Sequence, residues 1–293
     1  MQSENATKRV IKILVSVVVL LVDWAFALLS LAVGRRTAAR CVVFCYHSVS
    51  EHERVGFQQQ MDALLRYAKP LRAETTTPLG SAERYAVVTF DDGFESVVVN
   101  ALPVLRARNI PATLFVVTDG LGGFPSWQSF EADLHREARI MSADQLQALP
   151  RELVSIGSHT LTHPVLTAVP HAAARREIAE SKRKLEQLTG REIRLFSFPY
   201  GSFNQDAVAW CREAEYERVF TVEPALGFVQ GTEFVTGRVT VEPTDWAIEF
   251  HLKLRGAYRW ISCAARFKRK LISCPMLSLL SEVLTLRRKR GTG

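Results

Sequence analysis

The sequence contains few cysteines, no internal repeat and no low-complexity linker. Its 5 cysteines are an odd number without regular pairing, which argues against a disulfide framework and weakly favours a reducing compartment. With 47% hydrophobic and 23% charged residues, the chain is globular rather than disordered. A length of 293 residues suits one large α/β domain with appendages.

The N-terminal segment, residues 1–38, is predicted to associate with a membrane. From Val10 to Val33 it is almost wholly apolar, interrupted by Lys12 and Asp23. The 21 residues from Ile13 onward are enough to cross a bilayer, and no small-residue cleavage site follows them. Because a carboxylate is costly in lipid, both an uncleaved anchor and a helix lying in the interface remain open. Basic residues on both sides leave the orientation undecided.

The C-terminal segment, residues 261–293, is predicted to be a basic amphipathic tail. The net charge of +7 is concentrated partly in two clusters here, Arg266, Lys268, Arg269 and Lys270, and then Arg287, Arg288, Lys289 and Arg290. Cations beside apolar residues favour an anionic membrane surface. No nucleic-acid motif accompanies the charge, so no nucleic-acid partner is expected. A solvated tail that binds nothing is the simpler alternative. A membrane-associated location follows, on a side that stays open.

A buried strand that ends in two carboxylates is the first candidate for a functional site. Residues 85–90 form a short apolar, β-branched run, followed by Asp91, Asp92 and Gly93. Parallel folds place their chemistry at the carboxyl ends of such strands. Since consecutive side chains point in different directions, one carboxylate can bind a metal while the other stays free as a base. An ordinary Asp-Asp-Gly turn is the alternative.

Two histidines follow a second strand candidate, residues 153–157. The i, i+4 spacing of His159 and His163 predicts that both imidazoles lie on one face of a helical turn, which Ser158 or Thr160 would cap. Two histidines and one aspartate make a three-ligand set that leaves room for water, as in a catalytic metal site. Two unrelated histidines, one exposed and one in the core, remain the alternative.

With a third motif, Leu195 to Gly201, these residues resemble the polysaccharide deacetylases of the NodB homology type, carbohydrate esterase family 4. The resemblance implies an α/β fold, a distorted (β/α)7-type barrel over residues 39–260. It also implies metal-dependent removal of acetyl groups from N-acetylated sugars in a glycan. Zinc suits an Asp-His-His site, although cobalt, nickel or manganese could occupy it.

The resemblance also implies roles for individual residues. Asp91 corresponds to the general base, and the metal ligands correspond to Asp92, His159 and His163. Tyr200, which follows the proline of the third motif, would donate its backbone N–H to the oxyanion.

Two departures from the family pattern are visible. Many members have an arginine two residues before that proline, where this chain has Ser197, and Arg238 could supply the charge instead. The late Leu-x-x-His motif is absent, and His251 lies in an amphipathic pattern that predicts a structural role. Tyr46 and His47 follow a strand candidate at residues 41–45. A Tyr-His pair at this place resembles the poly-N-acetylglucosamine deacetylase branch of the family, and His47 could then act as the general acid. A hydrogen-bonded histidine at a strand end is the alternative.

Two other functions remain open at this stage: a non-catalytic carbohydrate-binding relative, and a membrane-surface or nucleic-acid adaptor driven by the basic tail. The ionisable Asp91 argues against the first, since binding alone needs no base beside a metal. Surface helices are predicted over residues 174–188, ending at Gly190, and over residues 204–215. A loop at residues 120–131 contains Trp127, which could stack on a sugar or simply pack.

Overall fold

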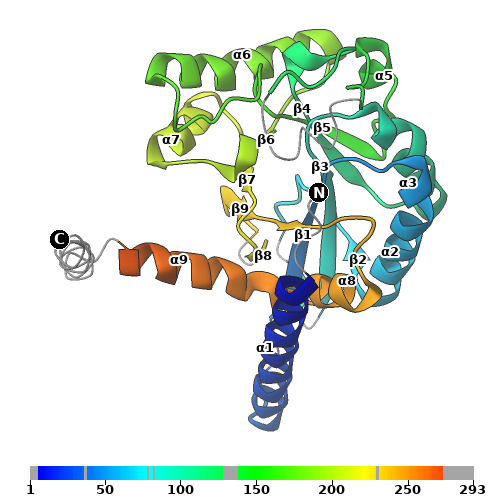
Figure 1. Ribbon diagram of the computed structural model, residues 1–293, viewed down its shortest axis with the longest axis vertical. Coiled ribbons are helices and arrows are strands. Elements are labelled where there is room, and N and C mark those ends of the chain that lie inside the picture. Colours follow the sequence, from blue (N-terminus) through cyan, green and yellow to red (C-terminus); the bar gives the residue numbers. More distant parts are fainter. Residues whose placement is uncertain are drawn as a thin grey trace, which may run out of the picture.

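Parallel strands form the centre of the computed structural model, which describes residues 6–35, 38–77, 79–81, 83–127, 138–228 and 231–272 (Figure 1). The main strands are β1 (Arg40–Tyr46), β3 (Arg84–Phe90), β4 (Ala112–Val116), β5 (Val154–Ser158), β6 (Leu195–Ser197), β7 (Arg218–Thr221), β9 (Val235–Gly237) and β10 (Val239–Thr240). Two short strands flank them, β2 (Lys69–Pro70) beside β3 and β8 (Leu226–Gly227), which runs antiparallel to β1.

The strand order shows how the sheet closes on itself. It runs β10-β1-β3-β4-β5-β6-β7-β9, and each of these neighbours pairs in parallel. The first and last strands of this path, β10 and β9, are consecutive in the chain and separated by Arg238 alone. The fold is therefore a distorted α/β barrel, and Arg238 lies at its seam.

Helices surround the sheet because parallel strands need crossover connections. They are α1 (Ala6–Ala32), α2 (Arg54–Tyr67), α3 (Leu102–Arg108), α5 (Ala143–Gln147), α6 (His171–Thr189), α7 (Gln205–Glu213), α8 (Ala247–Leu254) and α9 (Trp260–Ile272), with single turns η1 (Glu51–Glu53), η2 (Val97–Ala101), η3 (Thr118–Gly120), η4 (Pro199–Gly201) and η5 (Ala257–Arg259).

Both surface helices expected from the sequence are present. In α6 the apolar positions Ala174, Ile178 and Leu185 are buried, and the helix ends at Gly190 in the left-handed conformation that glycine adopts without strain. In α7 the side chain of Asn204 accepts a hydrogen bond from a backbone N–H of the first turn and so caps the helix.

Helix α1 is the one helix among the described residues that is long and apolar enough to cross a membrane. Part of it packs on α8 and η5, and the rest projects from the body of the molecule (Figure 1). His251, expected to be structural, lies in α8, where its ring packs edge-on against Tyr67. The second basic cluster and Cys274 lie outside the described residues.

Candidate metal centre

Three predicted ligands converge at the carboxyl ends of β3 and β5. The Nε2 atoms of His159 and His163 lie 3.2 Å apart. Asp92 Oδ1 lies 3.5 Å from His159 Nε2 and 3.3 Å from His163 Nε2. All three residues are buried, and together they form a group that could hold a metal ion.

The spacing of these atoms fits a small divalent cation. A tetrahedral zinc ion with ligand distances of about 2.0–2.1 Å keeps its ligand atoms about 3.3 Å apart. The three distances observed here, 3.2–3.5 Å, bracket that value. With three protein ligands, a fourth position would be left for water or substrate.

The histidines are also in the right protonation state to bind a metal. His159 Nδ1 lies 2.8 Å from the carbonyl oxygen of Ser197, which can only accept, so Nδ1 carries the proton and Nε2 presents its lone pair. Burial lowers the pKa of His159 to about 4 and that of His163 to about 2. Both imidazoles are therefore neutral at pH 7.

The expected helical turn between the two histidines is wrong. Residues 159–163 form an irregular loop after β5, and Thr160 and His163 have positive φ angles of 70° and 63°. Hydrogen bonds hold this loop in place: Thr160 Oγ1 accepts from the backbone N–H of His163, and the Glu177 carboxylate of α6 accepts from Leu161 and Thr162. The loop, not a helix, brings the two rings together.

Asp91, the neighbour of the ligand Asp92, forms a buried ion pair with Arg238. Arg238 Nη1 donates to Oδ1 and Nη2 to Oδ2, both at 2.6 Å, in a bidentate arrangement. Burial alone would raise the pKa of Asp91, but the charge and hydrogen bonds of Arg238 hold it well below its usual range. Arg238, which is fully buried, in turn has a raised pKa because of Asp91, despite its own burial. Asp91 is therefore a carboxylate at working pH.

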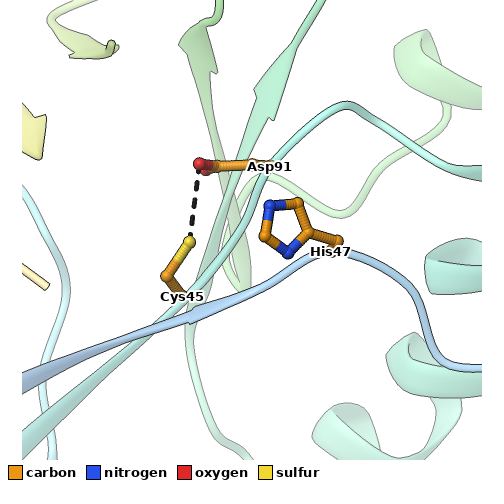
Figure 2. Close-up of side chains that lie close together, drawn as sticks. All are labelled: Cys45, His47 and Asp91. Atoms are coloured by element: carbon orange, nitrogen blue, oxygen red, sulfur yellow. Dashed lines mark hydrogen bonds between the residues drawn. The ribbon is translucent and has the colours of Figure 1, made fainter. Parts of the chain in front are cut away.

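Three further side chains surround the Asp91 carboxylate. Ser197 Oγ donates to Asp91 Oδ2 at 3.1 Å and accepts from Arg238 Nη2 at 2.7 Å. The Cys45 thiol lies 3.5 Å from the same carboxylate oxygen. Figure 2 shows that Cys45 and His47, both from the end of β1, approach Asp91 from one side. Potential ligand atoms of Cys45, His47 and Asp91 lie within 4.8 Å of one another.

Two aromatic rings pack against His163. Tyr200, in η4, lies edge-on with its ring centroid 4.5 Å from that of His163 and is 37% exposed. Trp127 lies on the imidazole at 4.7 Å and is buried, and it also packs with Val117 and Ile140. The Trp127 ring thus contributes to the wall of the site, whereas residues 128–137 lie outside the described part of the chain.

Comparison with known proteins identifies the family. The sequence profile of the polysaccharide deacetylases matches residues 80–219, which contain the metal ligands and Asp91. This chain belongs to the polysaccharide deacetylase family. YxkH of Bacillus subtilis, named provisionally as a polysaccharide deacetylase, is 22% identical over 216 residues, 70% of this chain and 72% of its own length. A poly-beta-1,6-N-acetyl-D-glucosamine N-deacetylase of Staphylococcus aureus is 22% identical over 181 residues, and this chain spans 58% of its length.

Solved structures show the same fold. IcaB from Ammonifex degensii is 26% identical with a TM-score of 0.64, over 74% of this chain and 98% of that one. The Streptococcus pyogenes deacetylase PplD, solved with acetate, is 19% identical with a TM-score of 0.60, over 74% of this chain and 99% of that one. The barrel of this chain therefore has the fold of this family, and the long apolar helix α1 precedes the barrel in the sequence.

Several contacts at the site had no signal in the sequence. In the sequence Cys45 is only the last residue of the strand candidate at residues 41–45, yet its thiol faces the Asp91 carboxylate. In the sequence Ser197 only marks the position at which many family members have an arginine, yet its hydroxyl links Asp91 to Arg238. Thr89, the last residue but one of β3, accepts a hydrogen bond from Arg238 Nη1 at 3.0 Å. Such contacts depend on strands distant in sequence, so only the closed barrel reveals them.

Proposed function

We propose that this chain is a metal-dependent carbohydrate N-deacetylase that hydrolyses the acetamide of N-acetylated sugars in a glycan. The observation that carries the proposal is the pairing of two features. Asp92, His159 and His163 present three converging ligand atoms, and the adjacent Asp91 is held as a carboxylate by Arg238. A binding protein has no need for a buried, charged carboxylate beside a metal site.

Zinc is the metal we propose, because two imidazoles and a carboxylate at tetrahedral spacing suit it, although cobalt, nickel or manganese prefer overlapping ligands. When bound, a divalent metal lowers the pKa of a coordinated water and polarises the substrate carbonyl. His159 and His163 would hold it through Nε2, and Asp92 through Oδ1.

Asp91 is the proposed general base. Its carboxylate lies 3.9 Å from His159 Nε2, so it adjoins the position of the attacking water. Arg238 and Ser197 act as positioning residues, since their hydrogen bonds fix the carboxylate without using the substrate. In this chain Arg238 provides the charge that many family members take from the position of Ser197.

His47 is the proposed general acid, which would donate a proton to the leaving amine. It lies beside Asp91 at the end of β1, and imidazole is the usual acid–base group near neutral pH (Figure 2). The backbone N–H of Tyr200 is the proposed oxyanion donor. Tyr200 has a positive φ of 56° in the turn η4, beside the metal ligand His163.

A non-catalytic carbohydrate-binding relative is the alternative that the experiment must separate. We would measure bound metal and acetate release from N-acetylglucosamine oligomers in the same preparation, for the wild type and Asp91→Asn. We expect the variant to retain the metal and lose acetate release. A metal-loaded wild type that binds the oligomers but releases no acetate from any of them would make the alternative correct.

Membrane association is a further part of the proposal. Its support is the apolar helix α1, whose large side chains remain exposed along most of its length. The basic residues of α9 add to it, because α9 follows directly on η5, which packs on α1. The proposed partners are thus an N-acetylated glycan and a lipid surface, with no nucleic acid. Sedimentation with vesicles of anionic lipid tests this part separately from catalysis.

A further inference from the structure

One face of α1 carries three polar side chains at intervals of seven residues, and all three bind the body of the protein. Arg9 Nε donates to Glu249 Oε2 at 2.6 Å, and the Ser16 hydroxyl accepts from Trp260 Nε1 at 2.9 Å. Asp23 is the third. Seven residues are close to two helical turns, so the three side chains form one stripe along the helix.

The Asp23 carboxylate binds two arginines. Arg259 Nη2 donates to Oδ1 at 2.5 Å, and Arg40 Nη1 donates to Oδ2 at 2.6 Å. The carboxylate that would be costly in lipid is therefore neutralised by the catalytic domain. A helix fixed at three points along its length has a defined direction relative to the barrel.

The two outer contacts set that direction. Arg9 lies at the carboxyl-end side of the barrel, because it binds Thr244 and Glu249, which follow β10. Asp23 lies at the opposite side, because Arg40 is the first residue of β1. Helix α1 therefore runs antiparallel to β1, and its last turns leave the barrel at the amino ends of the strands, away from the metal centre.

Beyond Asp23, α1 is apolar and exposed on nearly all sides. The large side chains of this part are between 48% and 68% exposed: Trp24, Phe26, Leu28, Leu29 and Leu31. A helix that is apolar all round is stable in a protein core or in lipid, and the large apolar side chains of this part are not covered by the described body of the protein. The nine residues from Trp24 to Ala32 rise about 14 Å, close to half of a hydrocarbon core of about 30 Å.

The face of the barrel from which this part of α1 projects is rich in arginine. A cavity of about 400 Å³ at the amino ends of β5 and β6 is lined by four arginines and two glutamates, the arginines being Arg72, Arg151, Arg191 and Arg194. A second cavity beside Asp23 and Glu83 is lined by Arg40, Arg84 and Arg255. Burial and the nearby charges of Arg255 and Arg40 lower the pKa of Arg84, a repulsion that anions would relieve. This face is complementary to anionic headgroups.

We propose that the exposed end of α1 inserts into one leaflet of an anionic bilayer, and that the Arg9–Ser16–Asp23 stripe holds the barrel upright, with its metal centre facing away from the lipid. Six residue steps along β1 measure about 20 Å. Asp91 lies level with the far end of β1, since its N–H donates to the carbonyl of Tyr46. The active site therefore acts on sugars at the far end of the barrel, about 20 Å along β1 from the end that faces the bilayer.

Two tryptophans test the orientation because they are equally exposed, at 48%, and lie at opposite ends of the barrel. Trp24 is in the exposed end of α1, whereas Trp246 stacks on Arg9 at the carboxyl-end side. With the full chain bound to anionic vesicles that carry brominated acyl chains, we expect strong quenching of the wild-type fluorescence. The quenching should be weaker in Trp24→Phe and unchanged in the control Trp246→Phe.

If something other than a lipid leaflet in this orientation covers the exposed end of α1, the experiment gives a different result. A helix lying flat in the interface would place both tryptophans near lipid, so that each variant reduces the quenching, and this would overturn the proposal. If a second copy of the chain covered α1, the protein would be a stable dimer, and neither the wild type nor the two tryptophan variants would show quenching. Absence of vesicle binding would also overturn it.

The consequence for the substrate rests on the proposed deacetylase function. On vesicles, we expect acetate release from long lipid-linked N-acetylglucosamine oligomers but none from a single lipid-linked sugar. Asp23→Asn should weaken the contacts of the stripe with the barrel and so allow release from the single sugar. The matched control Asp62→Asn should not, although it replaces a carboxylate of α2 that also accepts two hydrogen bonds from one arginine, Arg108. Equal rates on short and long lipid-linked glycans would refute the orientation. Failure on free oligomers as well would instead refute the deacetylase function.

Discussion

The ion pair between Arg238 and Asp91 makes a sharp prediction for Arg238→Met. Arg238 donates five hydrogen bonds inside the barrel, two of them to Asp91 and the others to Thr89, Ser197 and Thr221. Methionine fills part of the space but carries no charge. The variant therefore leaves a buried carboxylate without its cation.

Removing one partner of a buried ion pair costs about 3–5 kcal/mol of unfolding free energy. With a urea slope of about 3 kcal/mol per M for a chain of this size, the unfolding midpoint should fall by about 1–2 M. The cost comes mainly from the stranded charge. In the double variant Arg238→Met/Asp91→Asn no buried charge is left, so much of the lost stability should return.

The pH dependence follows from the low pKa of Asp91 in the folded protein. A carboxyl group whose pKa is lower in the folded state stabilises the fold above its unfolded pKa, about 3.9, and loses that contribution as the pH falls toward the folded value. In Arg238→Met no cation opposes the effect of burial on the pKa of Asp91, so the stability difference from the wild type should be largest at neutral pH and above, and should shrink as the pH falls and Asp91 of the variant takes up its proton.

Urea unfolding followed by circular dichroism measures the stability of the wild type and of both variants. Arg218 supplies the matched control, because it is also a buried arginine but donates to backbone carbonyls, those of Ala73 and Gly231 among others. Arg218→Met should destabilise the protein without rescue by Asp91→Asn. If Asp91→Asn rescues neither arginine variant, the stranded-charge reasoning is wrong.

Three further predictions concern the rest of the site and the core. His163→Ala should remove one of three ligands and lower the bound metal, measured by elemental analysis, while circular dichroism stays unchanged. Gly157→Ala should destabilise by about 1–3 kcal/mol, because the new Cβ would lie 2.4 Å from the Phe115 ring; a urea midpoint equal to wild type would contradict it. Tyr46→Phe should cost about 1–3 kcal/mol, because the Gln60 side chain loses its buried donor at 2.8 Å, and thermal unfolding measures the loss.

Local patterns were enough to predict the elements that carry the site. The apolar run at residues 85–90 became β3 with almost the same bounds, and the run at 153–157 became β5. All three predicted ligands, Asp92 and the two histidines, meet because parallel strands end at one edge of the barrel. In these segments a short apolar run coincides with a strand that is buried in the barrel, so a few neighbouring residues are enough to predict the strand.

The backbone of the site could not be predicted in this way. Asp92, Thr160, His163 and Tyr200 all have φ between 56° and 70°, a region that non-glycine residues enter only when surrounding contacts require it. The spacing of the histidines fits a helix equally well, so the sequence alone favoured the wrong local structure. Thr160 Oγ1 accepts a hydrogen bond from His163 within the loop, but the bonds that the Glu177 carboxylate accepts from the loop form only when α6 packs beside it.

The position of Arg238 links the closure of the barrel to the charge of the site. A buried ion pair is by itself a weak source of stability, and an apolar pair of similar volume would often stabilise a fold as well. Here, however, Arg238 stands between β9 and β10, which pair with β7 and β1, and its guanidinium reaches strands β3 and β6 through Thr89 and Ser197. An apolar residue at this seam could close the barrel but would leave Asp91 free to take up a proton in its buried position. The charge at the seam therefore stabilises the ionised carboxylate that the proposed reaction needs, and the fold accepts its desolvation because five hydrogen bonds compensate it.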